Sequence, residues 1–215
     1  VLMMCGRPVI FNEVRREAPA ILCTWWLGSE AGNAICNVLW GDYNPSGKLP
    51  MTFPQHNGQI PLYYQYKSTG RPTALGGWCA KYIDIPTEPA YPFGYGLSYT
   101  TFNYSDVKLL PGDGKGTYTR VAVTVTNTGK CEGEEVVQLY VRDEVASITR
   151  PIKELKGFEK IFLKAGESKK VSFKITPELL KFYNYNLDFV CEPGDFEVMI
   201  GRSCRDVKKA AFKLL

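Results

Sequence analysis

Apolar residues alternate strictly with polar ones along four stretches of the second half of the chain, and this pattern limits the fold more than any other feature. Successive side chains of a strand point to opposite faces of a sheet, so a period of two indicates strands with one buried face. Turn residues separate the stretches, for example Pro111-Gly112 and the run from Glu192 to Asp195. The four stretches are TRVAVTVTNTG, EEVVQLYVRDE, ESKKVSFKI and GDFEVMIG, with Val121, Val123, Val125, Val137, Leu139, Val141, Val171, Phe173, Ile175, Phe196, Val198 and Ile200 on their inner faces.

Short alternating strands joined by regular turns predict a β-sandwich of immunoglobulin or fibronectin III type over residues 100–215. The Cys–Trp–Cys pattern of antibody domains is absent, so we predict seven strands without a core disulfide. The seven cysteines of the chain contain no CxxC pair, which disfavours zinc ribbons and thioredoxin-like sites. Cys5, Cys23 and Cys36 lie in apolar runs, where a thiol behaves as a small buried hydrophobe, so we expect mostly free thiols.

The first 53 residues show a different pattern, which reads strand, helix, strand, helix. VLMMC and AILCTWW are apolar runs typical of parallel strands buried on both faces, and adjacent Trp25 and Trp26 are both expected in the core. Two strands and two helices cannot cover both faces of such a sheet. We therefore expect the rest of an α/β domain upstream of Val1, which opens in mid-strand, and an exposed edge in this chain.

The loop GDYNPSGKLP, residues 41–50, resembles a phosphate-binding loop only in part. Five residues separate Gly41 from Gly47-Lys48, one too many for a P-loop, and Leu49 stands where Ser or Thr would hold magnesium. An amphipathic helix over residues 29–40 precedes the loop, whereas a strand precedes a P-loop. We predict a helix exit with Gly41 in a left-handed conformation.

Residues 54–99 are rich in Pro, Gly and Tyr and keep neither a helical nor a strand period. The segment is too aromatic for a flexible linker, so we expect an ordered, extended connection that its tyrosines hold against both neighbours. Long loops of this kind are often functional.

The overall composition is that of a globular protein, and it disfavours several classes of function. Of the 215 residues 45% are hydrophobic and 22% charged, and no apolar run approaches the roughly 18 residues of a membrane span. The net charge of +4 comes from scattered lysines that read as the solvated face of strands. A nucleic-acid partner is not predicted, because its surface would need clustered basic residues.

Several unrelated motifs, in order along the whole chain, resemble glycoside hydrolase family 3, and they are most similar to its periplasmic-type bacterial β-glucosidases. The motifs are GNAICNVLWGDYNPSGKLPMTFPQ, GQIPLYY, STGRP, YPFGYGLSYTTF, VTNTGKCEGEEVVQLYV, RPIKELKGFEKIFLKAGES and EPGDFEVMIG. The resemblance implies an α+β multidomain fragment of a three-part parent: a (β/α)8 barrel, an α/β sandwich domain, and a fibronectin III-like domain. Residues 1–53 would end the α/β sandwich domain, 54–99 would connect, and 100–215 would form the last domain.

The resemblance also implies where the chemistry lies. A retaining glycosidase uses two carboxyl groups about 5 Å apart, one as nucleophile and one as general acid/base. In this family the nucleophilic Asp comes from the barrel, and the acid/base Glu precedes the stretch that matches Gly6-Arg7-Pro8. Both would lie upstream of Val1, so we expect no catalytic residue in this chain, and neither a metal nor an organic cofactor.

Local substitutes for such a pair are weak. Pro86 lies between Asp84 and Glu88 and forbids a helix that would align them, and Glu13 with Glu17 reads as a surface charge pair. His56, the single histidine, has no evident Ser or Cys partner for a triad.

Three residues of the connection are our candidates for substrate contact: Arg71, Trp78 and Tyr82. Aromatic rings stack on sugar faces and a guanidinium binds hydroxyl groups, so these side chains would line the outer edge of a sugar site. The competing interpretation is that they only anchor the connection.

The first functional hypothesis is therefore the C-terminal part of a retaining exo-β-glycosidase. Terminal β-glucose is the sugar that we expect the parent enzyme to remove, and a periplasmic or secreted location follows from the resemblance alone. A homodimer is compatible with this hypothesis. The alternative is a free-standing β-sandwich module for carbohydrate binding or protein interaction. The α/β sequence ahead of the sandwich argues against the alternative, because a lone module would begin near its own first strand.

Overall fold

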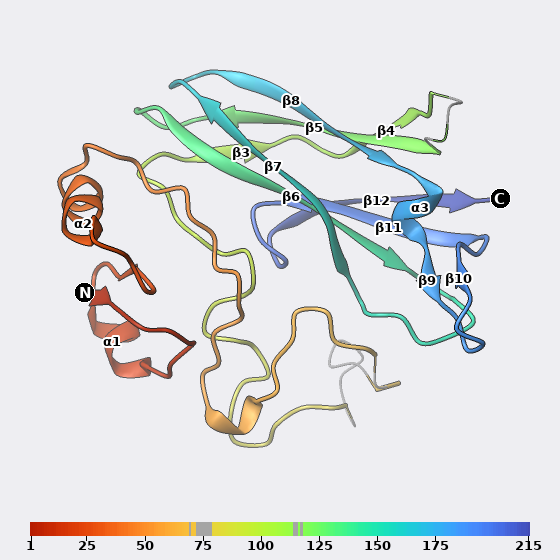
Figure 1. The fold of residues 1–215 in the computed structure, drawn as a ribbon, viewed down its shortest axis with the longest axis horizontal. Helices are drawn as coiled ribbons and strands as arrows, with labels where there is room; N and C mark the ends of the chain where they lie inside the picture. The colour runs from red at the N-terminus through yellow and green to blue at the C-terminus, as the bar shows by residue number, and fades with distance from the viewer. Residues whose placement is uncertain (69, 72–78, 114–115, 117) are drawn as a thin grey trace.

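The computed structural model describes residues 1–68, 70–71, 79–113, 116 and 118–215. It contains a small α/β segment, a long irregular connection and a β-sandwich, which Figure 1 shows in that order from red to blue. The chain begins and ends at well-separated places in this view.

The N-terminal segment has the predicted order of strand, helix, strand, helix. Its elements are β1 (Leu2–Met3), α1 (Asn12–Glu17), β2 (Leu22–Cys23) and α2 (Ala31–Trp40). β1 and β2 are parallel, with Met3 opposite Cys23, as the two apolar runs predicted. Each strand is only two residues long. The chain is no longer extended at Trp25, two residues after β2, where φ is +53°.

Apolar side chains of this segment are widely exposed. α2 has no fully buried residue, and only Ala31, Ile35 and Val38 on its inner face are half-buried. The prediction that Trp26 packs in a core is wrong, because its side chain is 85% exposed, and Cys36 is also exposed rather than buried. The physical reason is that burial needs a second layer packed over these side chains. The described residues of this segment form only a two-stranded sheet, which is too small to provide that layer.

α2 ends where the sequence predicted. Gly41 has a φ of 87°, which a residue with a Cβ rarely adopts, and its N–H donates to Val38 O. The chain then leaves the helix without forming a phosphate-binding loop, and the loop instead runs onto the sandwich. Asn44 Nδ2 donates to Glu132 O at 2.8 Å, and Tyr43 Oη donates to Glu134 Oε2 at 2.7 Å.

The sandwich consists of two packed antiparallel sheets. One has the order β12-β11-β6-β7, and in the other β5 pairs with β3 and β4 along one edge and with β8 along the opposite edge. Their bounds are β3 (Phe102–Tyr104), β4 (Lys108–Pro111), β5 (Thr119–Asn127), β6 (Gly133–Asp143), β7 (Glu154–Leu163), β8 (Ser168–Ile175), β11 (Gly194–Gly201) and β12 (Val207–Leu214). Since β3 and β4 share one edge as an interrupted strand, the sandwich has the seven strand positions that were predicted.

The alternating residues form the core between the two sheets, as predicted. Val121 and Val125 of β5 are fully buried, and they belong to one apolar cluster with Leu139 of β6 and Val198 of β11. No disulfide crosses this core, because all seven cysteines are free thiols. No covalent bond between side chains therefore links the two sheets across this core.

Smaller elements complete the structure: the 3-10 turn η1 (Asn57–Gln59) in the connection, the short helix α3 (Pro177–Leu180), and a hairpin of β9 (Phe182–Tyr183) and β10 (Phe189–Val190). Thr176 caps α3, since its hydroxyl accepts from Leu179 N. No helix among the described residues is long and apolar enough to span a bilayer.

Candidate functional site

The described residues of the range 54–99, the connection, contact both the α/β segment and the sandwich through aromatic side chains. Towards the α/β segment, Phe53 is fully buried and its N–H donates to Tyr91 O at 2.9 Å. The ring of Phe11 from the loop before α1 lies 6.1 Å from the ring of Tyr91 and stacks on it. These contacts bring the start and the end of the connection together beside α1.

Towards the sandwich, Tyr64 is the main contact. Its ring stacks on Phe93 with centroids 4.2 Å apart and meets the fully buried Tyr140 of β6 edge-on at 5.9 Å. The hydroxyl of Tyr64 accepts from Leu155 N at 3.2 Å, and burial raises the pKa of this phenol. One tyrosine thus attaches the connection to the central strand β6 and to the edge strand β7 of the same sheet.

The interior of the connection is held by a buried amide. Gln59 is 1% exposed, and its Oε1 accepts from Gln55 N at 2.6 Å while its Nε2 donates to Pro86 O at 2.8 Å. His56, which the sequence left without a catalytic partner, caps η1: its Nδ1 accepts from Gly58 N at 3.0 Å. The histidine therefore has a local structural role.

The described residues 66–68, 70–71 and 79–82, called the projecting tip below, carry two of the three predicted substrate contacts, Arg71 and Tyr82. Ala80 N donates to Arg71 O at 2.8 Å, so the chain returns on itself and brings Arg71 close to the stretch that contains Tyr82. Both side chains are exposed, Tyr82 to 38%. Trp78 lies outside the described residues. Among the described residues, neither Arg71 nor Tyr82 lines either of the two hollows at Phe102–Lys208 and Ser68–Ile152.

The sandwich supports the base of this tip. Lys67 forms an antiparallel bridge with Pro151, and Ile152 N donates to Tyr66 O at 3.0 Å. Glu88, one of the carboxylates weighed above as half of a catalytic pair, is instead bound to Arg205 in an ion pair. The described residues also contain no group of three or more His, Cys, Asp and Glu side chains that could hold a metal ion.

A buried polar network links the loop after α2 to the sandwich, and sequence reasoning missed it. Glu135 is 2% exposed; its Oε2 lies 3.0 Å from Lys48 Nζ, and its Oε1 accepts from Tyr104 Oη at 2.9 Å. The sequence did indicate that this side chain is buried: Glu135 lies two residues before the inward-facing Val137 on β6, so both side chains point to the same face of the sheet. Lys48, the lysine of the P-loop-like sequence, therefore neutralises a buried carboxylate rather than a phosphate.

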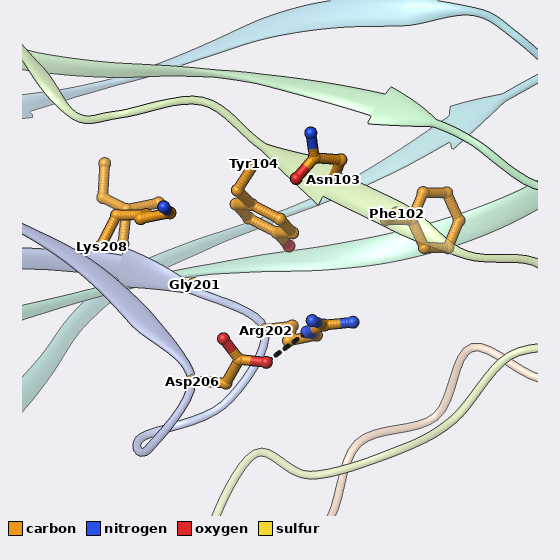
Figure 2. A pocket seen from close by; sticks show the side chains of 8 residues that line it. Phe102, Asn103, Tyr104, Gly201, Arg202, Asp206 and Lys208 are labelled. Atoms are coloured by element: carbon orange, nitrogen blue, oxygen red, sulfur yellow. Dashed lines mark hydrogen bonds and ion pairs between the residues drawn. The ribbon is translucent and has the colours of Figure 1, made fainter.

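A hollow beside this network is shown in Figure 2, between β3 and the hairpin of β11 and β12. Arg202 Nε donates to Asp206 Oδ2 at 2.5 Å across its mouth. Its volume of about 70 Å³ is well below the roughly 300 Å³ at which small-ligand sites begin, so it is too small for a sugar.

Comparison with protein families assigns both halves of the chain. Residues 1–99 match the Glycosyl hydrolase family 3 C-terminal domain, and residues 135–204 match the Fibronectin type III-like domain. The second match confirms the predicted type of sandwich. The two matches occur in the order that the sequence motifs implied.

Individual relatives agree along the whole chain. A periplasmic β-glucosidase of Salmonella typhimurium is 51% identical over 222 residues, and a putative β-xylosidase of Formosa agariphila is 45% identical over 215; each alignment covers 100% of this chain. The crystal structure of a β-glucosidase from Listeria innocua in complex with glucose superposes with a TM-score of 0.92 at 44% identity, over 99% of this chain.

These relatives are much longer proteins. The chain spans 29% of the Salmonella protein, 28% of the Formosa protein and 30% of the Listeria protein. With the two family matches in sequence order and a common fold at high identity, the chain belongs to glycoside hydrolase family 3.

Proposed function

We propose that this chain is the C-terminal portion of a retaining exo-β-glycosidase, and that the whole enzyme removes terminal β-glucosyl residues. The observation that carries the proposal is the match of the entire chain, at 51% identity, to a protein described as a periplasmic β-glucosidase. The same relationship supports a periplasmic or secreted location. No metal or cofactor is required, because the chemistry needs one nucleophilic and one acid/base carboxyl group.

In this proposal the chain contributes structure, and other parts of the enzyme contribute the catalytic carboxylates. A (β/α)8 barrel would supply the nucleophilic Asp, and the remainder of the α/β domain the acid/base Glu. The exposed apolar side chains of residues 1–40, among them Trp26 and Trp40, support such a neighbour, since contiguous exposed apolar surface marks an interaction site.

Residues 1–53 would then complete the α/β domain, 54–99 would act as the connection, and 100–215 would buttress both. The buried Lys48–Glu135 pair and the stacked ring of Tyr64 support this division of roles, because each joins one unit to the next. A homodimer is compatible with it.

Arg71, Trp78 and Tyr82 would reach the outer edge of the sugar site from the projecting tip. The exposure of Arg71 and Tyr82, and the support of the tip's base by Pro151 and Ile152, favour this role. In the enzyme extended upstream, Arg71→Ala would raise the KM for a disaccharide more than the KM for an aryl glucoside, because only the disaccharide places a second sugar there. Equal effects on both substrates would indicate a purely structural role.

A β-xylosidase is the second candidate, favoured by the Formosa relatives at 45% and 46% identity. The test is hydrolysis of chromogenic aryl β-glucoside and aryl β-xyloside by the upstream-extended protein. A higher kcat/KM for the glucoside supports the proposal, and a higher value for the xyloside selects the second candidate. Inactivity on both substrates, with oligosaccharide or protein binding instead, would favour the free-standing module.

A further inference from the structure

Two cysteines stand next to each other where the strands of the α/β segment end. Cys23 is the last residue of β2, and Cys5 lies two residues beyond the end of β1. The parallel ladder ends at the pair of Met3 and Cys23. Met3 and Cys5 are half-buried, whereas Met4 between them is 67% exposed, so the chain continues to alternate as far as Cys5. Cys5, Met3 and Cys23 therefore point to one face, and the register makes the two cysteines diagonal neighbours.

The two chains stay side by side beyond the ladder. Before Cys5, Thr24 N donates to Met3 O at 3.0 Å. After Cys5, the ring of Trp26 lies against Gly6, because a Cβ placed on Gly6 would fall 2.5 Å from Cε2 of that ring. These contacts precede and follow Cys5 along the chain and keep it beside the end of β2.

The thiol groups of Cys5 and Cys23 are in direct contact through a side-chain hydrogen bond. Both are half-buried free thiols in this structure. Burial raises the pKa of Cys23, and the neighbouring Cys5 thiol raises it further. A disulfide would shorten this contact to a bond of about 2.05 Å, which needs the two Cα atoms about 4.4–6.8 Å apart. Cys5 can adjust to that distance because it lies outside the ladder, so the adjustment breaks no strand pairing.

We propose that Cys5 and Cys23 form a disulfide that joins the ends of β1 and β2 when the protein is in an oxidising compartment. The inference goes beyond the proposed function. It agrees with the proposed periplasmic or secreted location, since disulfides persist there and are rare in a reducing cytosol. The oxidant is a disulfide of that compartment, carried by a protein or by a small molecule.

The bond forms by two successive exchange steps. One thiolate of the pair attacks a sulfur of the donor disulfide, whose S–S bond breaks, so a mixed disulfide forms and one donor thiolate leaves. The second thiolate then attacks the cysteine sulfur of the mixed disulfide and releases the second donor thiolate. The two protons from Cys5 and Cys23 end on the donor thiols, and the donor gains the two electrons that the cysteines lose.

The link would close the part of the chain that contains α1 into a covalent loop. It would tie together two strands that share a ladder of only two residue pairs. A cross-link of this kind acts chiefly by restricting the unfolded chain. Its effect should be local, because the sandwich has its own core and can remain folded while the α/β segment opens.

The test treats the folded 215-residue chain, and the same chain extended upstream, with oxidised glutathione at about pH 8, where part of the thiol is ionised. Remaining thiols are alkylated in urea, and the linked peptides are mapped by mass spectrometry. The peptide that joins Cys5 to Cys23 should be at least about tenfold more abundant than any other pairing among the seven cysteines. The same oxidation of the chain unfolded in urea should remove this preference.

Two variants and a matched control separate this pair from the other thiols. Cys5→Ser and Cys23→Ser should each abolish the link. Cys36→Ser removes an exposed thiol of the same segment and should leave the link intact. Amide hydrogen exchange is the second measurement: oxidation should slow exchange at residues 22–24 in the native chain and leave it unchanged in Cys5→Ser.

A folded upstream-extended protein in which Cys5 and Cys23 both stay thiols, or each carry a separate glutathione, would overturn the inference. Equal yields of all pairings would overturn it as well. Hydrolysis of an aryl β-glucoside by the extended protein is a separate readout. Hydrolysis without the link would remove this inference and leave the proposed function intact, whereas a linked but inactive protein would do the reverse.

Discussion

Lys48 Nζ lies 3.0 Å from Glu135 Oε2, and this ion pair joins the loop after α2 to the central strand β6 of the sandwich. The two side chains are 10% and 2% exposed. Lys48 Nζ also donates to Gly96 O at 2.9 Å, and Tyr104 Oη donates to Glu135 Oε1. Three distant parts of the chain therefore meet at one buried carboxylate.

Lys48→Met should destabilise the fold strongly. It leaves the Glu135 carboxylate buried without its counter-charge, and the loss of one partner from a buried pair costs about 3–5 kcal/mol of unfolding free energy. Urea unfolding of the variant measures the loss. The matched control is Lys169→Met, whose ammonium lies 3.8 Å from Glu159 on the surface and should cost at most about 1 kcal/mol.

The double variant Lys48→Met/Glu135→Leu separates the two causes of that loss. If an unpaired buried charge is responsible, the double variant should be more stable than Lys48→Met alone. A double variant that is less stable than Lys48→Met alone would contradict this explanation and would point to lost packing around Lys48.

Gly96→Ala should also destabilise the junction between the connection and the loop after α2. A Cβ at Gly96 would collide with the backbone oxygen of Gly47, and forced overpacking typically costs about 1–3 kcal/mol. The control is Gly28→Ala, because a Cβ there meets no atom within 4 Å. Thermal unfolding of the two variants should show a loss for Gly96→Ala only; an equal change in both would refute the close contact.

Stability should fall at acid pH partly through Glu134. Its hydrogen bonds from Lys160 and Tyr43 lower the pKa of this carboxyl below its ordinary value of 4.5. A carboxyl with a lowered folded pKa stabilises the protein above its unfolded pKa, and that contribution disappears as the pH falls through the folded pKa. The effect is small because the side chain of Glu134 is partly accessible to solvent, which screens its interactions.

The measurement is the urea midpoint of the native protein and of Glu134→Gln between neutral pH and about pH 3. The difference between the two urea midpoints should become smaller as the pH falls below about 4.5. Glu132→Gln removes the same charge from the neighbouring turn and serves as the control. A gap for Glu134→Gln that stays constant with pH would show that the ionised form of Glu134 contributes nothing.

The thiols should react in the order of their exposure. Cys36 and Cys131 are exposed and should react fast with an aromatic disulfide reagent, whereas Cys204 is buried and burial raises its pKa, so little reactive thiolate is present. Cys204→Ser should leave the fast phase unchanged, and Cys36→Ser should reduce it. A fast phase that is lost with Cys204→Ser would contradict the packing of Cys204 beside Tyr140 and Met199.

The sandwich could be predicted from the sequence because its signal is local. The parity of Val121, Val137 and Val198 fixes which face is buried, and the turns between the strands use residues with strong turn preferences. Gly41 was predicted for a similar reason, since a helix end demands a particular backbone conformation. In each case the neighbours in sequence carry the information.

The incorrect predictions concern residues whose environment depends on distant parts of the chain. Trp26 and Cys36 were placed in a core on the basis of apolar sequence, yet burial requires a covering layer that two strands and two helices do not form. The Lys48–Glu135 pair spans 87 positions, and sequence periodicity does not report the partner of an inward-facing charge. Substrate contacts by Arg71, Trp78 and Tyr82 remain a prediction.

The most direct measurement is hydrolysis of an aryl β-glucoside by the 215-residue chain beside the same chain extended upstream through the rest of the α/β domain and the barrel. We expect activity in the extended protein alone, with the β-anomer as the first product, because a retaining mechanism inverts the anomeric centre twice. Turnover by the 215-residue chain alone would contradict it, since a catalytic pair would then have to lie among residues such as Asp84 and Glu88.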